Sequence, residues 1–154
     1  MSMQSRLLAQ LQRQIQRESG LSGADYEVLV ALSESPGGRL RAFELGRLTQ
    51  WEKSRMSHHL TRMEQRGLVA RETCVADTRY ADIVLTDAGR AAIEAAAPHH
   101  VGHVRAWFID AMTPEQLDQF GAACDAVLAK LDDKGEPDPC DGPQGTTAAD
   151  DVAC

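Results

Sequence analysis

The sequence predicts a mostly α-helical fold with one small β-hairpin, arranged as a winged helix-turn-helix between N-terminal and C-terminal helices. Three observations lead to this prediction. Apolar residues recur at helical spacing through most of the chain up to residue 131. Two short helical stretches are separated by only a few residues near position 50. Two strand-forming segments follow directly, and a hairpin behind a helix-turn-helix is a wing.

The chain begins with two predicted helices. The first spans about 4–18, and Gly20 ends it; its apolar residues are Leu7, Leu8, Leu11 and Ile15. Ser22 and Asp25 have the spacing of a capping box and begin the second helix. That helix ends at the turn formed by residues 35–38, and its apolar residues are Tyr26, Leu29, Val30 and Leu32.

Two short helices come next and form the predicted helix-turn-helix. We expect the third helix at about 41–49 and the fourth at about 53–66, with Trp51 packed in the turn between them. Gly67 ends the fourth helix. The apolar residues expected to point inward are Phe43, Leu45 and Leu48 from the third helix and Met56, Leu60 and Met63 from the fourth.

The predicted wing covers about 68–85, with strands at 68–71 and 81–85. Thr86 then caps a long helix over about 87–112, which Pro98 is expected to kink.

The last helix is expected to begin at the Thr-Pro-Glu-Gln stretch of residues 113–116 and to end near residue 131. It carries a continuous apolar stripe made of Leu117, Phe120, Cys124, Val127, Leu128 and Leu131. Residues 132–154 hold seven acidic residues, one Lys, three Pro, three Gly and no aromatic residue, which predicts a disordered acidic tail.

The charge is unevenly distributed along the chain. The net charge is −7, yet residues 39–79 contain nine Lys or Arg against five Asp or Glu. A basic segment in an acidic protein is typical of a surface that binds phosphates.

The outer face of the helix at 53–66 carries only side chains that can form hydrogen bonds: Lys53, Ser54, Arg55, Ser57, His58, Thr61 and Arg62. A helix in the major groove reads base edges with such groups. We assign Ser54, Ser57 and His58 to base edges, and the cations to phosphates or guanine. An ordinary solvated helix face is the alternative interpretation of the same residues.

Two charged residues occupy the predicted wing tip. Arg79 is placed to enter the narrow minor groove, where the negative potential attracts a guanidinium. Asp77 is placed to orient Arg79 or to pair with a base on the recognition helix, which is the predicted helix at 53–66. Asp is equally a common turn residue.

Three motifs at this spacing give the chain a family resemblance. They are Arg66-Gly67-Leu68-Val69 after the recognition helix, Asp77-x-Arg79 in the wing, and Leu85-Thr86-x-x-Gly89 at the entry to the long helix. Over about 21–113 the sequence resembles the MarR family of winged-helix transcriptional regulators.

The resemblance implies a homodimer that binds a pseudo-palindromic operator in double-stranded DNA, most often as a repressor, and that responds to a small-molecule effector between the dimer helices and the DNA-binding lobe. The implied organisation is an N-terminal dimerisation helix at 1–20, a DNA-binding lobe at 21–86, and C-terminal dimerisation helices at 87–131. An unburied apolar stripe on the last helix is compatible with such a dimer.

Several residues suggest how an effector acts. Val104, Trp107, Phe108 and Met112 are candidates for an apolar effector pocket, with dimer core as the alternative. His99, His100 and His103 raise the option of a metal sensor, although no Cys, Asp or Glu at matching spacing completes the set.

The four cysteines form no CxxC pair, so we expect free thiols and no zinc site. Cys74 in the wing leaves redox control open, whereas Cys124 on the apolar stripe is expected to be inert.

Other functional classes fit the sequence less well. No glycine-rich phosphate loop, catalytic triad or carboxylate pair is found, so we expect neither an enzyme nor a cofactor. A winged helix that binds another protein is the second hypothesis. No membrane span or secretory signal is found, so we expect a cytoplasmic protein that does not contact membranes.

Overall fold

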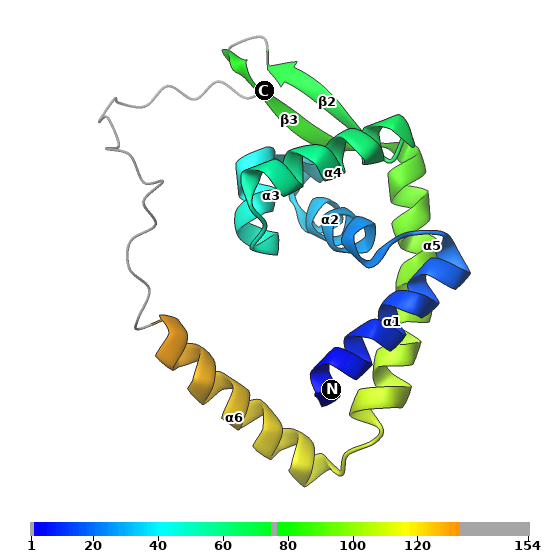
Figure 1. The fold of residues 1–154 in the computed structure, drawn as a ribbon, viewed down its shortest axis with the longest axis vertical. Helices are drawn as coiled ribbons and strands as arrows, with labels where there is room; N and C mark the ends of the chain where they lie inside the picture. The colour runs from blue at the N-terminus through cyan, green and yellow to red at the C-terminus, as the bar shows by residue number, and fades with distance from the viewer. Residues whose placement is uncertain (1, 75–76, 133–154) are drawn as a thin grey trace. The chain divides into compact units, whose positions relative to one another are not determined.

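The computed structural model describes residues 2–74 and 77–132, and the side chains of 74–80 are outside the description. The chain divides into two compact units, Met1–Trp107 and Phe108–Cys154, which we describe separately. The first unit contains five α-helices and three short strands among its described residues (Figure 1).

Helices α1, Met3–Ser19, and α2, Gly23–Glu34, are joined by a tight connection. Gly20 ends α1 in the left-handed region, at φ 69°, where glycine is favoured. The predicted capping box is confirmed: the Asp25 N–H donates to Ser22 Oγ at 3.0 Å, and the Ser22 N–H donates to Asp25 Oδ2 at 2.8 Å.

The helix-turn-helix consists of α3, Ala42–Thr49, and α4, Lys53–Gln65. Between them Gln50 has φ 55°, and the N–H of Trp51 donates to the carbonyl of Gly46 at 2.9 Å. Trp51 packs against the core, as predicted. The helix pair is therefore separated by a tight, hydrogen-bonded turn.

The prediction for the buried face of α3 was partly wrong. Leu45 is fully buried, but Phe43 and Leu48 are 57% and 65% exposed. Thr49, four residues after Leu45, is the other buried residue of this helix. Because α3 has only eight residues, it buries one narrow stripe, and neither Phe43 nor Leu48 lies on it.

The sheet has one more strand than predicted. Strands β2, Val69–Cys74, and β3, Asp77–Leu85, form the expected antiparallel hairpin, but they extend well into the stretch predicted as its turn, so that Asp77 and Arg79 lie in β3. The additional strand β1, Arg39–Arg41, pairs with the other edge of β3, so the order is β1-β3-β2. Three residues are too few to show the period-two pattern from which a strand is predicted.

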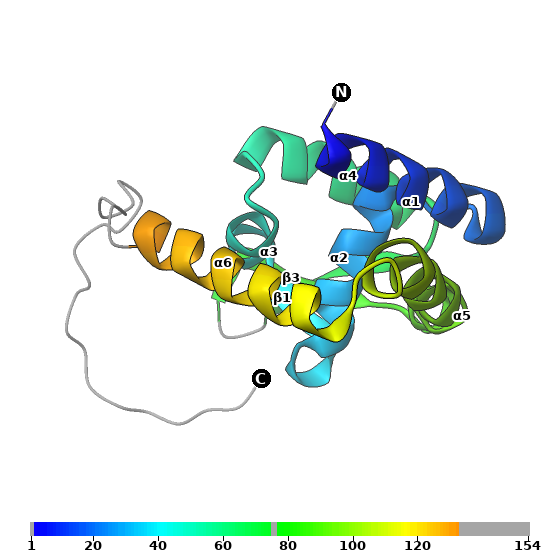
Figure 2. The ribbon, with the colours of Figure 1, turned by 90° about the horizontal axis from the view of Figure 1, so that it is seen from below.

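One apolar core holds this unit together, and α2 lies in its interior, with α1 and α5 to one side and α3 to the other (Figure 2). Its fully buried side chains come from α2, α3, α4, β2, β3 and the α1–α2 connection, and they include Leu21, Leu29, Leu32, Leu45, Met56, Leu60, Met63, Val69 and Ile83. The three residues predicted to point inward from α4 are all in this set. Burial of this face fixes which side of α4 meets solvent.

Helix α5, Asp87–Val104, packs along α1 (Figure 1). It is shorter than the predicted 87–112 because a π-helical turn, η2, Arg105–Ile109, follows it. Pro98 lies within α5, which continues past it for six residues. Thr86 caps α5 as predicted, since its Oγ1 accepts the N–H of Gly89 at 3.0 Å.

In the second unit, helix α6 spans Pro114–Asp132. The predicted start signal is confirmed, because Thr113 and Gln116 exchange backbone-to-side-chain hydrogen bonds at 2.9 and 3.3 Å. The predicted tail at 132–154 lies, apart from Asp132, outside the described residues. None of the helices in the described ranges has the length and hydropathy of a membrane span.

The wing and α5 meet at a close junction that explains two of the sequence motifs. Gly67, at φ 72°, closes α4 with a Schellman pair: its N–H donates to Glu64 and that of Leu68 to Met63. The hydroxyl of Thr86 lies 2.6 Å from the carbonyl oxygen of Gly67. Gly89 lies so close to Leu68 that only a residue without Cβ fits.

We predict that Gly89→Ala destabilises the protein by about 1–3 kcal/mol, because the added methyl group overlaps the Leu68 carbonyl and lies 2.9 Å from Leu85 Cδ1. Gly102→Ala is the matched control in the same helix, since nothing lies within 4 Å of its Cβ position. That variant should gain up to about 1 kcal/mol. Urea unfolding measures both changes. Equal stabilities for the two variants would contradict the close packing of Gly89 against Leu68.

Candidate nucleic-acid interface

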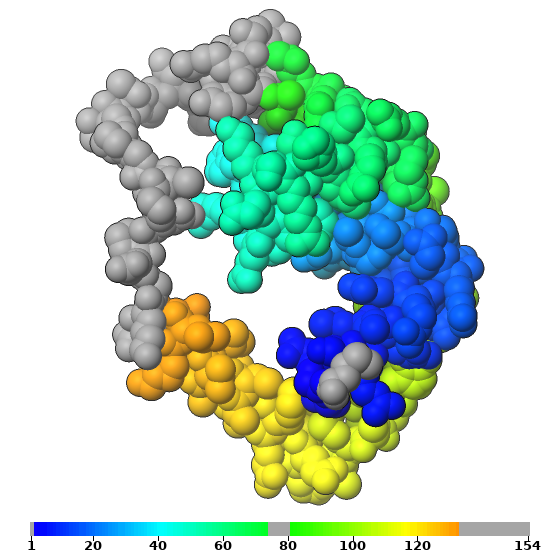
Figure 3. Space-filling model, in the orientation of Figure 1, coloured from blue at the N-terminus to red at the C-terminus, as the bar shows by residue number. Residues whose placement is uncertain are grey.

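Helix α4 lies at the surface of the first unit, beside α3 (Figure 3), and its exposed side carries polar and cationic residues. The structure brings the predicted site residues of this helix to that one face. Six are exposed and Thr61 is half-buried; the six are Lys53, Ser54, Arg55, Ser57, His58 and Arg62. The opposite face supplies Met56, Leu60 and Met63 to the core.

The cations of α4 differ from those of the sheet in their partners. On the sheet, Arg39 pairs with Glu72 at 2.9 Å and with Asp82 at 3.6 Å. Among the described residues, no carboxylate forms an ion pair with Lys53, Arg55 or Arg62. Within the described part of the chain these three cations therefore have no carboxylate at ion-pair distance, and Arg55 acts only at longer range on Glu27 of α2, where burial raises the pKa of the carboxyl and Arg55 opposes that rise.

Two of these arginines are held by uncharged rings. The guanidinium of Arg55 lies 4.0 Å above the centre of the Trp51 ring, a cation–π geometry. The Nη2 of Arg62 lies 3.2 Å from Nδ1 of His59. Both contacts order a side chain without removing its charge.

Thr61 connects α4 to the wing rather than standing free. Its hydroxyl donates to the Ser57 carbonyl at 3.0 Å and accepts from Arg71 Nη2 of β2 at 3.1 Å. Arg71 also lies 3.7 Å from Glu64. Sequence reasoning did not identify Arg71; its signal was a basic residue in the strand that directly follows the recognition helix.

A buried carboxylate anchors α4 from below. Asp25 of α2 is 2% exposed; its Oδ2 accepts from Arg66 Nη1 at 2.6 Å, and its Oδ1 lies 3.0 Å from His59 Nε2. Burial raises the pKa of Asp25, but the hydrogen bonds from Arg66 and Ser22 outweigh it and leave the pKa below its ordinary value. The network joins positions 25, 59 and 66, a long-range set that no local pattern reveals.

The wing tip is described only in part. Asp77 and Arg79 lie in β3, and their side chains fall outside the described residues, as does that of Cys74. Their roles at the DNA remain predictions.

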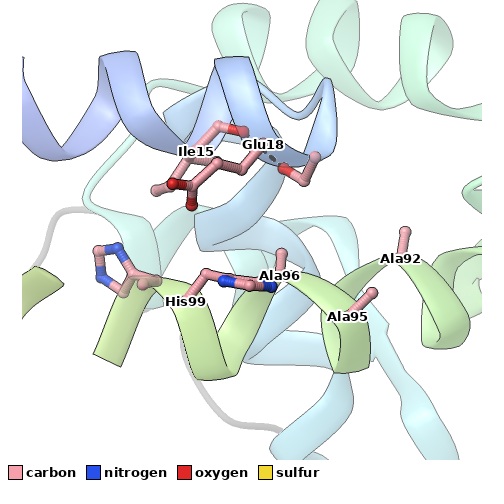
Figure 4. Close-up of a pocket in the computed structure, with 8 residues that line it drawn as sticks. Ile15, Glu18, Ala92, Ala95, Ala96 and His99 are labelled. Carbon is pink, nitrogen blue, oxygen red and sulfur yellow. Dashed lines mark hydrogen bonds between the residues drawn. The ribbon is translucent and has the colours of Figure 1, made fainter. Parts of the chain in front are cut away.

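A cavity of about 300 Å³ lies between α1 and α5 (Figure 4). Figure 4 shows Ile15 and Glu18 of α1 facing Ala92, Ala95, Ala96 and His99 of α5. His100 also lines it; its ring packs on Tyr26, and its buried Nδ1 has no hydrogen-bond partner in the described part of the chain. Burial, together with the neighbouring His103, lowers the pKa of His100.

The predicted effector residues do not line this cavity. Val104, Phe108 and Met112 are half-buried, and Trp107, 36% exposed, stacks on His103. His103 is hydrogen-bonded to Glu18 at 2.9 Å. Within residues 2–74 and 77–132, no three His, Cys, Asp or Glu gather as a metal site would require.

We predict that Asp25→Asn lowers the free energy of unfolding at pH 7 by about 2 kcal/mol, because it removes the charge of a buried carboxylate that is paired with Arg66. Arg66 is half-exposed, so solvent already screens part of this ion pair. Since the pKa of Asp25 is lowered, this stability is present above its ordinary value of 3.8 and is lost as pH falls below it. The variant should lack that acid-dependent loss. Glu72→Gln, which breaks an exposed pair, is the control and should cost about 1 kcal/mol or less.

Comparison with known proteins places this geometry in a family. The sequence pattern of the MarR family matches residues 19–79. Comparison with curated protein sequences found no match.

Solved structures agree over most of the chain. AbsC, a MarR family transcriptional regulator from Streptomyces coelicolor, is 40% identical, with 85% of this chain and 90% of AbsC covered and a TM-score of 0.73. Sco3205, a MarR family transcriptional regulator from the same organism solved in complex with DNA, is 39% identical, with 82% and 79% covered and a TM-score of 0.76. These identities and coverages show that the chain belongs to the MarR family of transcriptional regulators and is not an enzyme.

Proposed function

We propose that this protein binds double-stranded DNA as a homodimer, with α4 of each protomer in a major groove and the β2–β3 wing in the adjacent minor groove. It acts as a repressor at a pseudo-palindromic operator and responds to a small-molecule effector. The lobe that binds DNA corresponds to residues 21–86.

The exposed cationic face of α4 is the observation that carries this proposal. An exposed helix that presents hydroxyl, imidazole, ammonium and guanidinium groups, and no large apolar anchor, matches the demands of a base-paired groove. Protein-binding helices present aromatic or leucine anchors instead. The DNA complex of the related Sco3205 supports the same assignment.

The apolar stripe of α6 supports the homodimer. Phe120, Val127, Leu128 and Leu131 are 40–62% exposed in the single chain. Such a continuous apolar stripe on a 19-residue helix requires a partner surface.

The cavity between α1 and α5 is the proposed effector site. It is lined by alanine and isoleucine side chains together with Glu18 and two histidines, so it suits a small, partly apolar molecule with a hydrogen-bonding group. A ligand there contacts both helices and so can alter their packing.

We predict that selection from a random duplex library with the full-length protein enriches an inverted repeat, and that binding weakens steeply with salt. Arg79→Ala should cost roughly 1–3 kcal/mol on the selected duplex and relax discrimination where the wing contacts it. Lys53→Ala should weaken binding and reduce the salt slope by about one, because one fewer phosphate is neutralised. Fluorescence anisotropy measures both.

Lys130→Ala is the charge-matched control for these variants, because Lys130 lies on α6, outside α4 and the sheet. It should leave the affinity unchanged. Failure of the wild-type protein to enrich any sequence over random DNA would contradict the proposed function.

We predict that Leu128→Asp weakens dimerisation by about 3 kcal/mol, because the carboxylate would enter an apolar interface. Light scattering after size exclusion should give twice the chain mass for wild type and a single chain mass for the variant at low concentration. Ala129→Asp, at an exposed position on the side of α6 away from the apolar stripe, is the control. A Leu128→Asp protein that remains dimeric would place the interface elsewhere.

A further inference from the structure

His59 is a buried polar side chain in the middle of the apolar face of α4. It is only 6% exposed and lies between Met56 and Met63 in the sequence. Among the described residues, its ring contacts Asp25 of α2, Arg62 of α4 and Trp51 of the turn. These contacts indicate that the buried imidazole has a specific structural role beyond filling space in the core.

The contacts define its protonation state. A guanidinium only donates hydrogen bonds, so the Arg62 group 3.2 Å from Nδ1 requires an unprotonated nitrogen there. The ring proton then lies on Nε2, which is 3.0 Å from the carboxylate of Asp25. That contact is short but bent, and Nε2 has no well-aligned acceptor in the described part of the chain.

The same ring also supports a second arginine. Trp51 meets His59 edge-on, with ring centres 5.3 Å apart, and Arg55 lies over the Trp51 face at 4.0 Å. Arg55 and Arg62 are both exposed on the outer side of α4. One buried ring therefore lies under two cations of the proposed DNA-binding face.

We infer that His59 is a positioning residue for the DNA interface: as the neutral Nε2–H tautomer placed against Asp25, it holds Arg62 directly, and Arg55 through Trp51, in the orientations that contact DNA. The inference rests on the proposed function, because it assigns to those two arginines a role in binding DNA. It assigns the orientation of these arginines to a buried residue that does not itself contact DNA.

Protonation of His59 would release Arg62. Imidazolium carries a proton on both nitrogens, so Nδ1 could no longer accept, and the two cations would repel. The charged groups that face the ring are Asp25 from α2 and Arg55 and Arg62 from α4. Burial lowers the pKa of His59; Asp25 opposes this change, and Arg62 and Arg55 add to it. The ring is therefore neutral at pH 7, and Arg62 leaves its place only in acid.

Two substitutions separate the contacts of the ring. Asparagine places its amide oxygen at the same bond separation from Cβ as Nδ1, so His59→Asn retains an acceptor for Arg62. Glutamine places its amide nitrogen at the separation of Nε2, so His59→Gln retains the donor toward Asp25 and loses the acceptor. On the duplex selected by wild type, His59→Gln should weaken binding roughly 5- to 50-fold, and His59→Asn less than about threefold.

A double-mutant cycle with Arg62→Ala tests whether the effect runs through that arginine. In the Arg62→Ala background, His59→Gln should retain only the smaller effect that runs through Trp51 and Arg55, whereas in the Lys53→Ala background it should retain its full effect. An equal loss in all three backgrounds, or no loss in any, overturns the inference. Unfolding midpoints measured on the same samples identify a variant that is simply misfolded.

Two measurements do not need these variants to fold. Long-range proton–nitrogen NMR correlations of the wild-type protein at pH 7.5 should report His59 with Nδ1 unprotonated and Nε2 protonated; the opposite tautomer overturns the inference. The ratio of wild-type to Arg62→Ala affinity should fall over the acidic pH range in which the same NMR correlations show His59 becoming protonated. A ratio that stays constant while His59 becomes protonated likewise overturns the inference. If the wild-type protein selects no duplex, the proposed function is contradicted, whereas the NMR measurement still tests the tautomer of His59 independently.

Discussion

The buried carboxylate of Asp25 is the interaction on which the placement of α4 depends. It accepts from the Ser22 N–H at the start of α2 and from Arg66 at the end of α4, and it lies against His59 in the middle of α4. A carboxylate removed from water must be met by several donors, so these positions cannot shift independently. Because the rotation of α4 decides which side chains face solvent, this anchor beneath the helix determines the composition of its outer face.

The junction between the wing and α5 is the second constraint, and it links α4 to the rest of the unit. Directly after α4, the carbonyl groups of Gly67 and Leu68 accept hydrogen bonds from the Thr86 hydroxyl at the start of α5. The missing side chain of Gly89 allows that approach. The recognition helix, the base of the wing and the long helix thus share one set of contacts. The start of α5 is therefore joined to the end of α4 by short hydrogen bonds and direct packing.

The elements that local patterns specify were predicted well. The caps at Ser22 and Thr86, the glycine at the end of α4 and its buried face all follow from periodicity and capping chemistry. The prediction was wrong for Phe43 and Leu48 because it assumed that apolar residues of a short helix point inward. A single threonine, Thr49, takes the buried position instead, and its hydroxyl is satisfied by the Leu45 carbonyl within the helix at 2.8 Å.

The features that the sequence did not predict depend on contacts between distant positions. Strand β1 exists because β3 offers it an edge, and three residues carry no pattern of their own. The burial of Asp25 and His59 depends on each other and on Arg66, and Asp25 lies more than 30 residues before either partner. Charged and polar residues are assigned to the surface by default, and only a folded structure shows where two of them come together in the core.

The cations of the sheet and those of α4 differ in how their side chains are held. On the sheet, Arg39 and Arg71 pair with the carboxylates of Glu72, Asp82 and Glu64. On α4, by contrast, an indole and an imidazole take the place that a carboxylate would occupy beside Arg55 and Arg62. Such rings restrict the motion of a cation yet leave its charge for an external anion, so less ordering entropy is lost when a phosphate binds. Charge that is ordered but not paired with a carboxylate is a poor arrangement for stability alone and a good one for binding a polyanion.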